Sequence, residues 1–226
     1  MAKTFKIQIK GQVQGVGFRP FIFSLAKQYQ LKGTVSNNEN GVIIFCNTSK
    51  VGVDNFLKAL LLNKPEIAII TSYVIDESRY TEFNDFIIVA SKTKTQINLP
   101  LTPDFAVCES CKTEILDPKN RRFNYPFTTC VQCGPRYAIT TKFPFERVHT
   151  SLIKFDMCEV CNDEYTNPSD RRFHSQTNSC RACGIQLKLV INFGETITEN
   201  QADCIDKVVQ FISDGKIVAI KNTNGY

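Results

Sequence analysis

Residues 5–20 read FKIQIKGQVQGVGFRP, and this stretch decides the fold of the amino-terminal region. Apolar and polar residues alternate from Phe5 to Lys10, a period of two that predicts a half-buried strand. A glycine-rich turn follows over Gly11–Gly17. Pro20 then occupies a first-turn position of a helix, where its missing N–H costs no hydrogen bond. The stretch therefore predicts a strand, a loop and a helix in that order.

The rest of residues 1–91 continues this pattern into one small domain. Apolar residues recur at helical spacing from Ile22 to Tyr29 and extend the first helix. Asn and Gly residues over 37–41 separate two short apolar runs and supply the positive φ values of a hairpin turn. The remaining elements expected are one helix and two strands, over 53–61, 67–75 and 86–89. The resulting order βαββαβ is the ferredoxin-like arrangement, so the predicted fold class is α+β.

The composition indicates a globular chain that does not enter a membrane. The chain has 226 residues, of which 42% are hydrophobic and 22% charged, enough for a core. It contains no run of about 18 apolar residues, and its start lacks the apolar core of a signal peptide. These features predict a cytoplasmic protein, in a compartment where thiols stay reduced.

Ten cysteines stand out in such a chain, and eight of them form four C-x-x-C pairs. The pairs are Cys108/Cys111, Cys130/Cys133, Cys158/Cys161 and Cys180/Cys183. The second half of this region repeats the first with a period of 50 residues. The repeat includes the interior residues Glu114, Pro118, Arg121, Arg122 and Phe123, which match Glu164, Pro168, Arg171, Arg172 and Phe173. A shared interior identifies a duplicated module.

The spacing of the pairs is that of structural zinc sites. Two thiolates three residues apart can grip one tetrahedral ion, and two such pairs complete a closed four-thiolate site. We therefore expect two zinc ions, one in each of the modules 108–133 and 158–183, to supply much of the folding free energy of residues 101–190. A nested pairing, outer pair with outer pair and inner with inner, stays open. Disulfides and redox C-x-x-C sites fit the reducing compartment and the repeated spacing less well.

The formal net charge of +5 does not by itself indicate nucleic-acid binding. Each zinc tetrathiolate carries about −2, so two of them lower the charge of the whole chain to about +1. The pairs Arg121-Arg122 and Arg171-Arg172 are expected to bridge carboxylates and loop carbonyls inside their own module rather than to contact phosphates. A zinc-based regulatory or nucleic-acid-binding protein is therefore the weaker alternative.

Two further segments flank the modules. Residues 92–100 are polar and lack periodicity, which is typical of a linker. A strand-like run over 186–193 is followed by polar residues, and apolar residues over 204–212 predict a helix. Ile217–Ile220 predicts a strand. A helix and a strand rarely form a domain alone, so residues 198–226 are expected to begin a larger one.

The glycine-rich loop has the composition of an anion site. Its glycines let successive N–H groups converge on one anion, and the start of the following helix adds a favourable dipole. Arg19 adds a planar donor that binds phosphate or carboxylate through two hydrogen bonds. The expected phosphate-binding residues are Gln14, Gly15, Val16, Gly17, Phe18 and Arg19. The alternative is a tight turn with an exposed arginine.

The string VQGVGFR at 13–19 closely resembles the signature of the acylphosphatase family. A second motif of that family, Gly-x-Val-x-Asn, occurs at 33–37 as GTVSN, in the order that the family has. The resemblance implies that Arg19 and the loop N–H groups bind the phosphate and that Asn37 positions the attacking water. Thr34 replaces a tryptophan that is common in the family, a change expected to alter packing and not chemistry.

The whole chain resembles the hydrogenase maturation carbamoyltransferase family, in which an acylphosphatase domain, two four-cysteine modules and a YrdC-like domain follow one another. CGPR at 133–136 and RRFH at 171–174 also look like that family. The resemblance implies carbamoyl phosphate as substrate and a maturation partner whose C-terminal cysteine receives the carbamoyl group. It further implies that residues 198–226 begin the YrdC-like domain and that ATP is used only in domains downstream of this chain. A free-standing acylphosphatase is the other alternative, and the segment after residue 200 counts against it.

Overall fold

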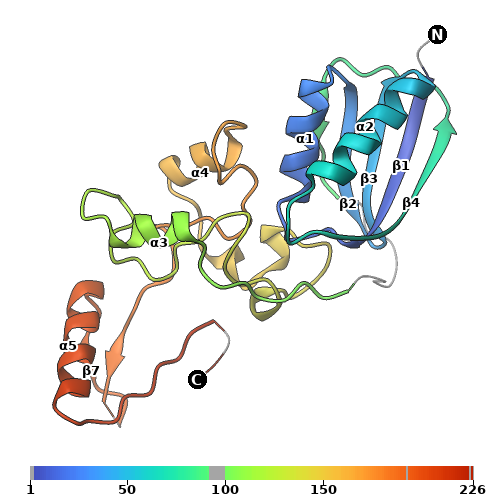
Figure 1. The fold of residues 1–226 in the computed structure, drawn as a ribbon. Helices are drawn as coiled ribbons and strands as arrows, with labels where there is room; N and C mark the ends of the chain where they lie inside the picture. Colours follow the sequence, from blue (N-terminus) through green and yellow to red (C-terminus); the bar gives the residue numbers. More distant parts are fainter. Residues whose placement is uncertain (1–2, 92–99, 192, 224, 226) are drawn as a thin grey trace.

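The computed structural model describes residues 3–91, 100–191, 193–223 and 225. Figure 1 shows three parts along the chain: an α/β domain, a middle region of short helices and loops, and a C-terminal helix that stands apart from the first domain. Most of the predicted linker, residues 92–99, lies outside the described residues. Among the helices described, none is long and apolar enough to cross a membrane.

The first domain is built on a five-stranded sheet with the order β4-β1-β3-β2-β5. Its strands are β1 (Lys3–Gln12), β2 (Lys32–Asn38), β3 (Gly41–Thr48), β4 (Ile69–Ser78) and β5 (Phe86–Ile88). β5 runs parallel to β2, and the other neighbouring strands are antiparallel. The helices α1 (Phe18–Gln28) and α2 (Lys50–Asn63) connect β1 to β2 and β3 to β4, which confirms the ferredoxin-like prediction.

The hairpin between β2 and β3 is tighter than the sequence indicated. Asn38 faces Gly41 in the strand register, so only Glu39 and Asn40 form the turn. Asn37 pairs with Val42 and is therefore a strand residue rather than a loop residue. The consequence is that Asn37 belongs to the rigid sheet, where its position is set by the ladder of hydrogen bonds.

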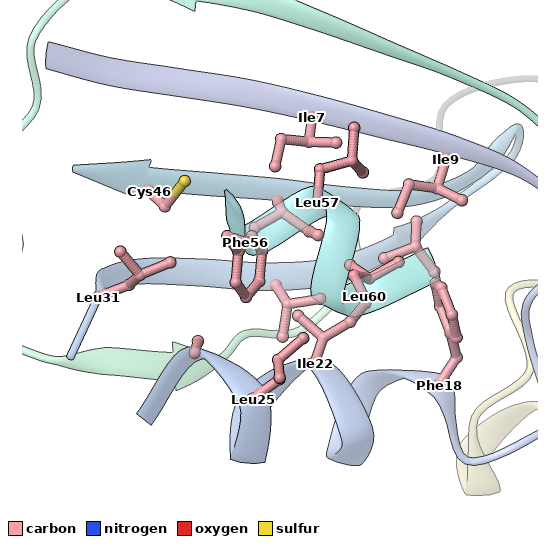
Figure 2. Packing of buried hydrophobic residues seen from close by; sticks show 14 of the residues in the cluster. Ile7, Ile9, Phe18, Ile22, Leu25, Leu31, Cys46, Phe56, Leu57 and Leu60 are labelled. Carbon is pink, nitrogen blue, oxygen red and sulfur yellow. The ribbon is translucent and has the colours of Figure 1, made fainter. Parts of the chain in front are cut away.

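Both helices cover one face of the sheet, and the core lies between helices and sheet (Figures 1 and 2). The strands and both helices contribute completely buried side chains, among them Ile7, Ile9, Ile22, Ile44, Phe56 and Leu60. Each such side chain contributes about 1.5–3 kcal/mol through the removal of apolar surface from water. This core gives the domain a stability of its own and fixes the connection between β1 and α1, where the predicted anion loop lies.

The middle region has little regular structure and is organised around the cysteine pairs. The helices α3 (Glu109–Leu116) and α4 (Glu159–Thr166) begin directly after Cys108 and Cys158, at equivalent positions of the repeat. Three short 3-10 helices lie between the modules, over Tyr137–Ile139, Arg147–His149 and Ser151–Lys154. The separate apolar cluster of this region has three buried members, too few to hold it together alone.

The C-terminal part differs from the prediction in its strands. The polar residues 194–202 include β7 (Thr196–Thr198), which pairs with β6 (Leu189–Val190). The helix α5 (Gln201–Ser213) confirms the predicted helix. Ile217–Ile220 does not form the predicted strand. Neither of the two sheets in the described residues includes this segment, so its backbone joins no ladder of hydrogen bonds.

Candidate active site and metal centres

Residues 13–19, called the phosphate loop below, join β1 to α1. Two glycines of the loop have left-handed backbone angles, with φ of 72° at Gly15 and 71° at Gly17. Residues with a side chain rarely adopt these angles, so the path of the loop requires both glycines. Within the described part of the chain, the N–H groups of Gly15–Arg19 donate no hydrogen bond. Unpaired N–H groups at the start of a helix are the donors that an anion site uses, so the geometry of the loop agrees with the predicted role.

Arg19 lies in the first turn of α1, and only 8% of its surface is exposed. Its Nη1 donates to Oε1 of Glu146 at 2.9 Å, and its Nη2 donates to the carbonyl of Phe145 at 3.4 Å. The same Oε1 atom of Glu146 accepts a hydrogen bond from the hydroxyl of Ser91. The guanidinium is thus held from one side by the middle region. The alternative of a tight turn with an exposed arginine is wrong.

Asn37 and Arg19 line one cavity together with the phosphate loop. The cavity has a volume of about 30 Å³, enough for a small polar group or a water. Asn37 is 2% exposed, and its Oδ1 has no hydrogen-bond partner among the described residues. A buried amide oxygen without a partner is costly, so it fits a site where water or a ligand completes the hydrogen bond. The structure therefore brings together the two residues and the loop that the sequence predicted as one site.

The side chain of Gln14 holds the phosphate loop to neighbouring segments of the chain. Its Nε2 donates to the carbonyls of Asn38 and Gly41, at 2.7 and 2.9 Å, and its Oε1 accepts from the N–H of Phe145 at 3.1 Å. The side chain is therefore used to tie the phosphate loop to the hairpin and to the middle region. Its carbonyl is also bound, at 2.8 Å, by the hydroxyl of Thr102.

The middle region forms the other part of the cavity wall. Its contributing residues are Val131, Arg136, Phe145, His174, Ser175 and Gln176. Sequence reasoning missed them as site residues because they lie roughly a hundred or more residues from the loop and in irregular segments. One signal was available: the repeat has Gln186 where the first module has Arg136, so the two modules differ at the residue that binds the loop.

Each module brings its own four cysteine sulfurs together. The first cluster consists of Cys108, Cys111, Cys130 and Cys133, and the second of Cys158, Cys161, Cys180 and Cys183. Neighbouring Sγ atoms are 3.5–3.8 Å apart in the first cluster and 3.6–3.8 Å apart in the second. A tetrahedral zinc ion with Zn–S bonds of about 2.3 Å requires sulfurs about 3.8 Å apart. Donor set and spacing fit one zinc ion per module, and the nested pairing does not occur.

The arginine pairs connect the two modules rather than acting inside their own, which corrects the prediction. Arg122 donates to both carboxylate oxygens of Glu164, at 2.9 and 2.5 Å, and Arg121 donates to the same carboxylate at 2.9 Å. The repeat-related pair Arg171-Arg172 binds Glu114 in the same manner. The prediction failed because the sequence repeat shows which residues of the two modules are equivalent. It does not show whether a residue contacts its own module or the other one.

The same arginines also approach the cysteine clusters of the opposite module. Arg121 donates to Sγ of Cys161, and Arg171 donates to Sγ of Cys111, each at 3.3 Å. A four-thiolate zinc site carries a net negative charge of about −2, and these guanidinium groups lie where they offset it. The arginine pairs are thereby used within the molecule, which weakens the nucleic-acid alternative.

The buried charges shift the pKa values of their partners. Burial disfavours ionisation of Glu164, but hydrogen bonds from Arg122 outweigh it and hold the pKa of Glu164 at about 2. The pKa of Glu114 is lowered by the same balance of burial and arginine contacts. Burial, assisted by the charge of Arg19, lowers the pKa of His174 to about 4. The imidazole beside the phosphate loop is therefore neutral at pH 7.

Comparison with known families gives two matches. Residues 5–88 match the acylphosphatase family. Residues 107–140 and 157–190 each match the HypF finger. The boundaries of these matches enclose the phosphate loop and Asn37 in the first case, and one four-cysteine cluster each in the second.

Three proteins illustrate the similarity. The carbamoyltransferase HypF of Synechocystis sp. is 41% identical over 226 residues, which is 100% of this chain and 29% of that protein. A crystal structure of full-length HypF in the phosphate- and nucleotide-bound form is 38% identical, with a TM-score of 0.87 over 99% of this chain and 29% of that one. An acylphosphatase of Thermotoga maritima is 34% identical over 87 residues, 38% of this chain and 96% of that protein. The chain thus spans about three tenths of the length of the carbamoyltransferases it matches.

Proposed function

Because the chain belongs to the HypF carbamoyltransferase family and carries an acylphosphatase domain, we propose that the site around Arg19 hydrolyses carbamoyl phosphate. The observation that carries the proposal is the cavity in which Arg19, the buried Asn37 and the unpaired N–H groups of the phosphate loop meet. These groups are the binding and positioning parts that hydrolysis of an acyl phosphate requires.

The phosphate loop binds the phosphoryl group in this mechanism. Its N–H groups and the Arg19 guanidinium donate to the phosphoryl oxygens, on which negative charge builds up as the reaction proceeds. The ion pair with Glu146 occupies one edge of the guanidinium and leaves further N–H donors of Arg19 for the substrate. Binding is thus strongest where the transition state has most charge.

Asn37 positions the attacking water. Its unpaired Oδ1 accepts a hydrogen bond from a water, which directs the water oxygen at phosphorus. The bond from water oxygen to phosphorus forms while the bond from phosphorus to the carbamoyl oxygen breaks. Carbamate leaves with that electron pair, and the proton of the water passes to a phosphate oxygen or to solvent.

The cysteine clusters have a structural part in this scheme. Zinc bound by four thiolates has no open position and therefore does not activate a substrate. It would hold the loops of the middle region in place, and those loops supply part of the cavity wall and the carboxylate that binds Arg19.

In the full-length family protein, we propose that this region supplies carbamate for an ATP-dependent formation of carbamoyl-adenylate by other domains. The carbamoyl group would then pass to the C-terminal cysteine of a hydrogenase maturation partner and become the cyanide ligand of a nickel–iron site. The match to longer carbamoyltransferases, one of them crystallised with phosphate and nucleotide, supports the carbamoyl-transfer part of this proposal. A cytoplasmic location is proposed with it, because eight zinc-binding thiols must stay reduced.

Phosphate release from carbamoyl phosphate by residues 1–226 tests the proposed reaction. We expect turnover by the wild-type chain and a loss of about a hundred-fold or more in kcat/KM, roughly 3 kcal/mol, in Arg19→Ala. Arg79→Ala removes an exposed arginine of the same domain and should keep the wild-type rate. The proposal fails if the wild-type chain releases phosphate no faster than carbamoyl phosphate decomposes spontaneously. It also fails if Arg19→Ala has the same kcat/KM as the wild-type chain.

A further inference from the structure

Arg136 lies between the first cysteine cluster and the phosphate loop, and it is 2% exposed. All five N–H donors of its guanidinium bind backbone carbonyls. Four of these bonds, at 2.9–3.2 Å, go to carbonyls within residues 130–135, the turn that holds the second cysteine pair of the first cluster. The fifth, from Nε, goes to the carbonyl of Gly15 in the phosphate loop.

The second module shows that such a turn closes without an arginine. Gln186 occupies the position equivalent to Arg136, and its Nε2 donates to the carbonyls of Arg181 and Gly184, at 2.7 and 3.1 Å. Both acceptors belong to the turn of the second module itself. The bond to the phosphate loop is therefore what distinguishes Arg136 from its counterpart.

We infer that Arg136 is a positioning residue of the phosphate site: it fixes the carbonyl of Gly15 from the first cysteine cluster and so holds the phosphate loop in its anion-binding form. That the loop binds a phosphoryl group rests on the proposed function, but the role of Arg136 in fixing the path of the loop does not. Cluster and loop are joined at a second point as well. A Cβ atom on Gly17 would lie 3.2 Å from Cβ of Val131, so the turn packs directly on the loop.

The planarity of the peptide bond explains how a bond to a carbonyl positions a donor. The C=O and N–H groups of a trans peptide point in opposite directions, so fixing the Gly15 carbonyl also fixes the direction of the Val16 N–H. Glycine allows the loop many alternative paths, and an external bond selects one of them. Arg136 also lines the cavity, which adds a permanent positive charge to its wall.

Amide hydrogen exchange and phosphate binding on the whole chain test this role. The variants are Arg136→Gln, which copies the second module, and Arg136→Lys, which keeps the charge without the planar fork. We expect Arg136→Gln to retain two zinc ions, to exchange the amides of residues 15–18 about ten-fold faster or more, and to weaken inorganic phosphate binding by about ten-fold or more. The exchange rates and the phosphate affinity of Arg136→Lys should lie between those of Arg136→Gln and those of the wild type. Gln186→Ala, the matched control in the second module, should leave exchange in the loop unchanged.

Wild-type exchange in the loop of a zinc-loaded Arg136→Gln protein would overturn the assignment. If Arg136→Gln binds fewer than two zinc ions, the test uses Arg136→Lys instead. Amide exchange at the wild-type rate in the loop of Arg136→Lys, or loss of zinc from that variant, would also overturn the assignment. If the wild-type chain neither binds phosphate nor releases it from carbamoyl phosphate, the proposed function fails. The exchange rates then still decide the role of Arg136, because they do not depend on turnover.

Discussion

At the scale of single residues, Asn37 has the most informative surroundings. It is buried in β2, yet its Oδ1 has no partner in the described part of the chain. An unsatisfied buried oxygen costs about 1–3 kcal/mol, so a well-packed domain retains one where a ligand or water completes the bond. The proposed water-positioning role supplies that bond and accounts for the burial at once.

Replacing Asn37 by alanine is therefore expected to affect turnover more than binding. We expect kcat for carbamoyl phosphate to fall about a hundred-fold, because the water loses its acceptor, while the inhibition constant of inorganic phosphate changes less than about three-fold. Steady-state kinetics with phosphate as competitive inhibitor measures both. Asn40→Ala in the turn of the same hairpin serves as control. Equal losses in kcat and in phosphate affinity would assign Asn37 to binding instead.

His174 predicts a pH dependence of stability. Its pKa is about 4 in the folded chain, mainly through burial, and about 6.5 in an unfolded one. Between these values the unfolded state holds a proton that the folded state does not. The free energy of unfolding therefore falls as pH drops from about 6.5 to 4, by about 1–2 kcal/mol for this residue after allowance for solvent screening.

His174→Asn isolates this contribution. The equivalent residue of the first module is Asn124, and both have left-handed backbone angles, with φ of 54° and 55°. Asparagine accepts such angles, so the substitution should not strain the turn. Urea unfolding at a series of pH values should show a shallower decline for the variant. Zinc release in acid affects both proteins alike, so parallel pH profiles would contradict the role of His174.

At the scale of elements, local patterns predicted most of the first domain. Three signals follow one another directly along the chain: the alternation in β1, the glycine-rich turn and the helical spacing in α1. Each signal is local, and the structure has each of them. The boundaries of the hairpin shifted because strand pairing extended through Asn37 and Asn38, which turn propensity alone does not reveal. Ile217–Ile220 has strand composition, but a strand also needs a neighbour.

Only the part of the candidate site that lies in the first domain could be predicted from the sequence. The phosphate loop and Asn37 occur in recognisable motifs, whereas Glu146, His174 and Arg136 reach the loop from irregular segments. No periodicity connects these segments to the first domain, because their positions depend on cysteine clusters and long-range contacts. Metal-ligand spacing predicted the clusters themselves, but not the surface that they present.

The cysteine clusters predict a definite metal content. Metal analysis of the protein purified under reducing conditions should give two zinc ions per chain, because there are two clusters of tetrahedral spacing. Chelation removes roughly 10 kcal/mol or more of folding free energy per site and should loosen residues 101–184. The sheet and helices of the first domain should remain folded on their own core. One zinc ion or none, or joint unfolding of both regions in hydrogen exchange, would contradict this.

At the scale of the whole molecule, the domains share one site. The cavity has walls from the first domain and from the middle region, and the ion pair of Arg19 and Glu146 spans the two. The buried arginine pairs in turn connect the two modules. A change in one module therefore affects the other, while the first domain keeps its own core.

The crossed arginines make this coupling measurable. We expect Arg122→Ala to expose the second cluster and Arg172→Ala to expose the first, since each removes the more buried of the two arginines that bind the glutamate of the other module. Removing one partner of a buried ion pair costs about 3–5 kcal/mol, and the second arginine that stays on each glutamate keeps the loss below that range. Timed alkylation followed by peptide mass spectrometry identifies which cysteines lose protection first. Faster alkylation in the variant's own module, with the other unchanged, would refute the coupling.

The exchange of arginines between the modules has the form of a two-fold symmetric dimer contained in one polypeptide. Arg121 of the first module donates a hydrogen bond to the second cluster, and Arg171 of the second module donates the equivalent bond to the first cluster. A single copy of the module would keep its thiolates and its glutamate but lack their guanidinium partners, and it would regain them only by association with an identical copy. Joining two copies in tandem replaces an encounter that depends on protein concentration with a fixed, high effective concentration. The repeat is thus a self-contained pair, and neither half is a domain that can be transplanted alone.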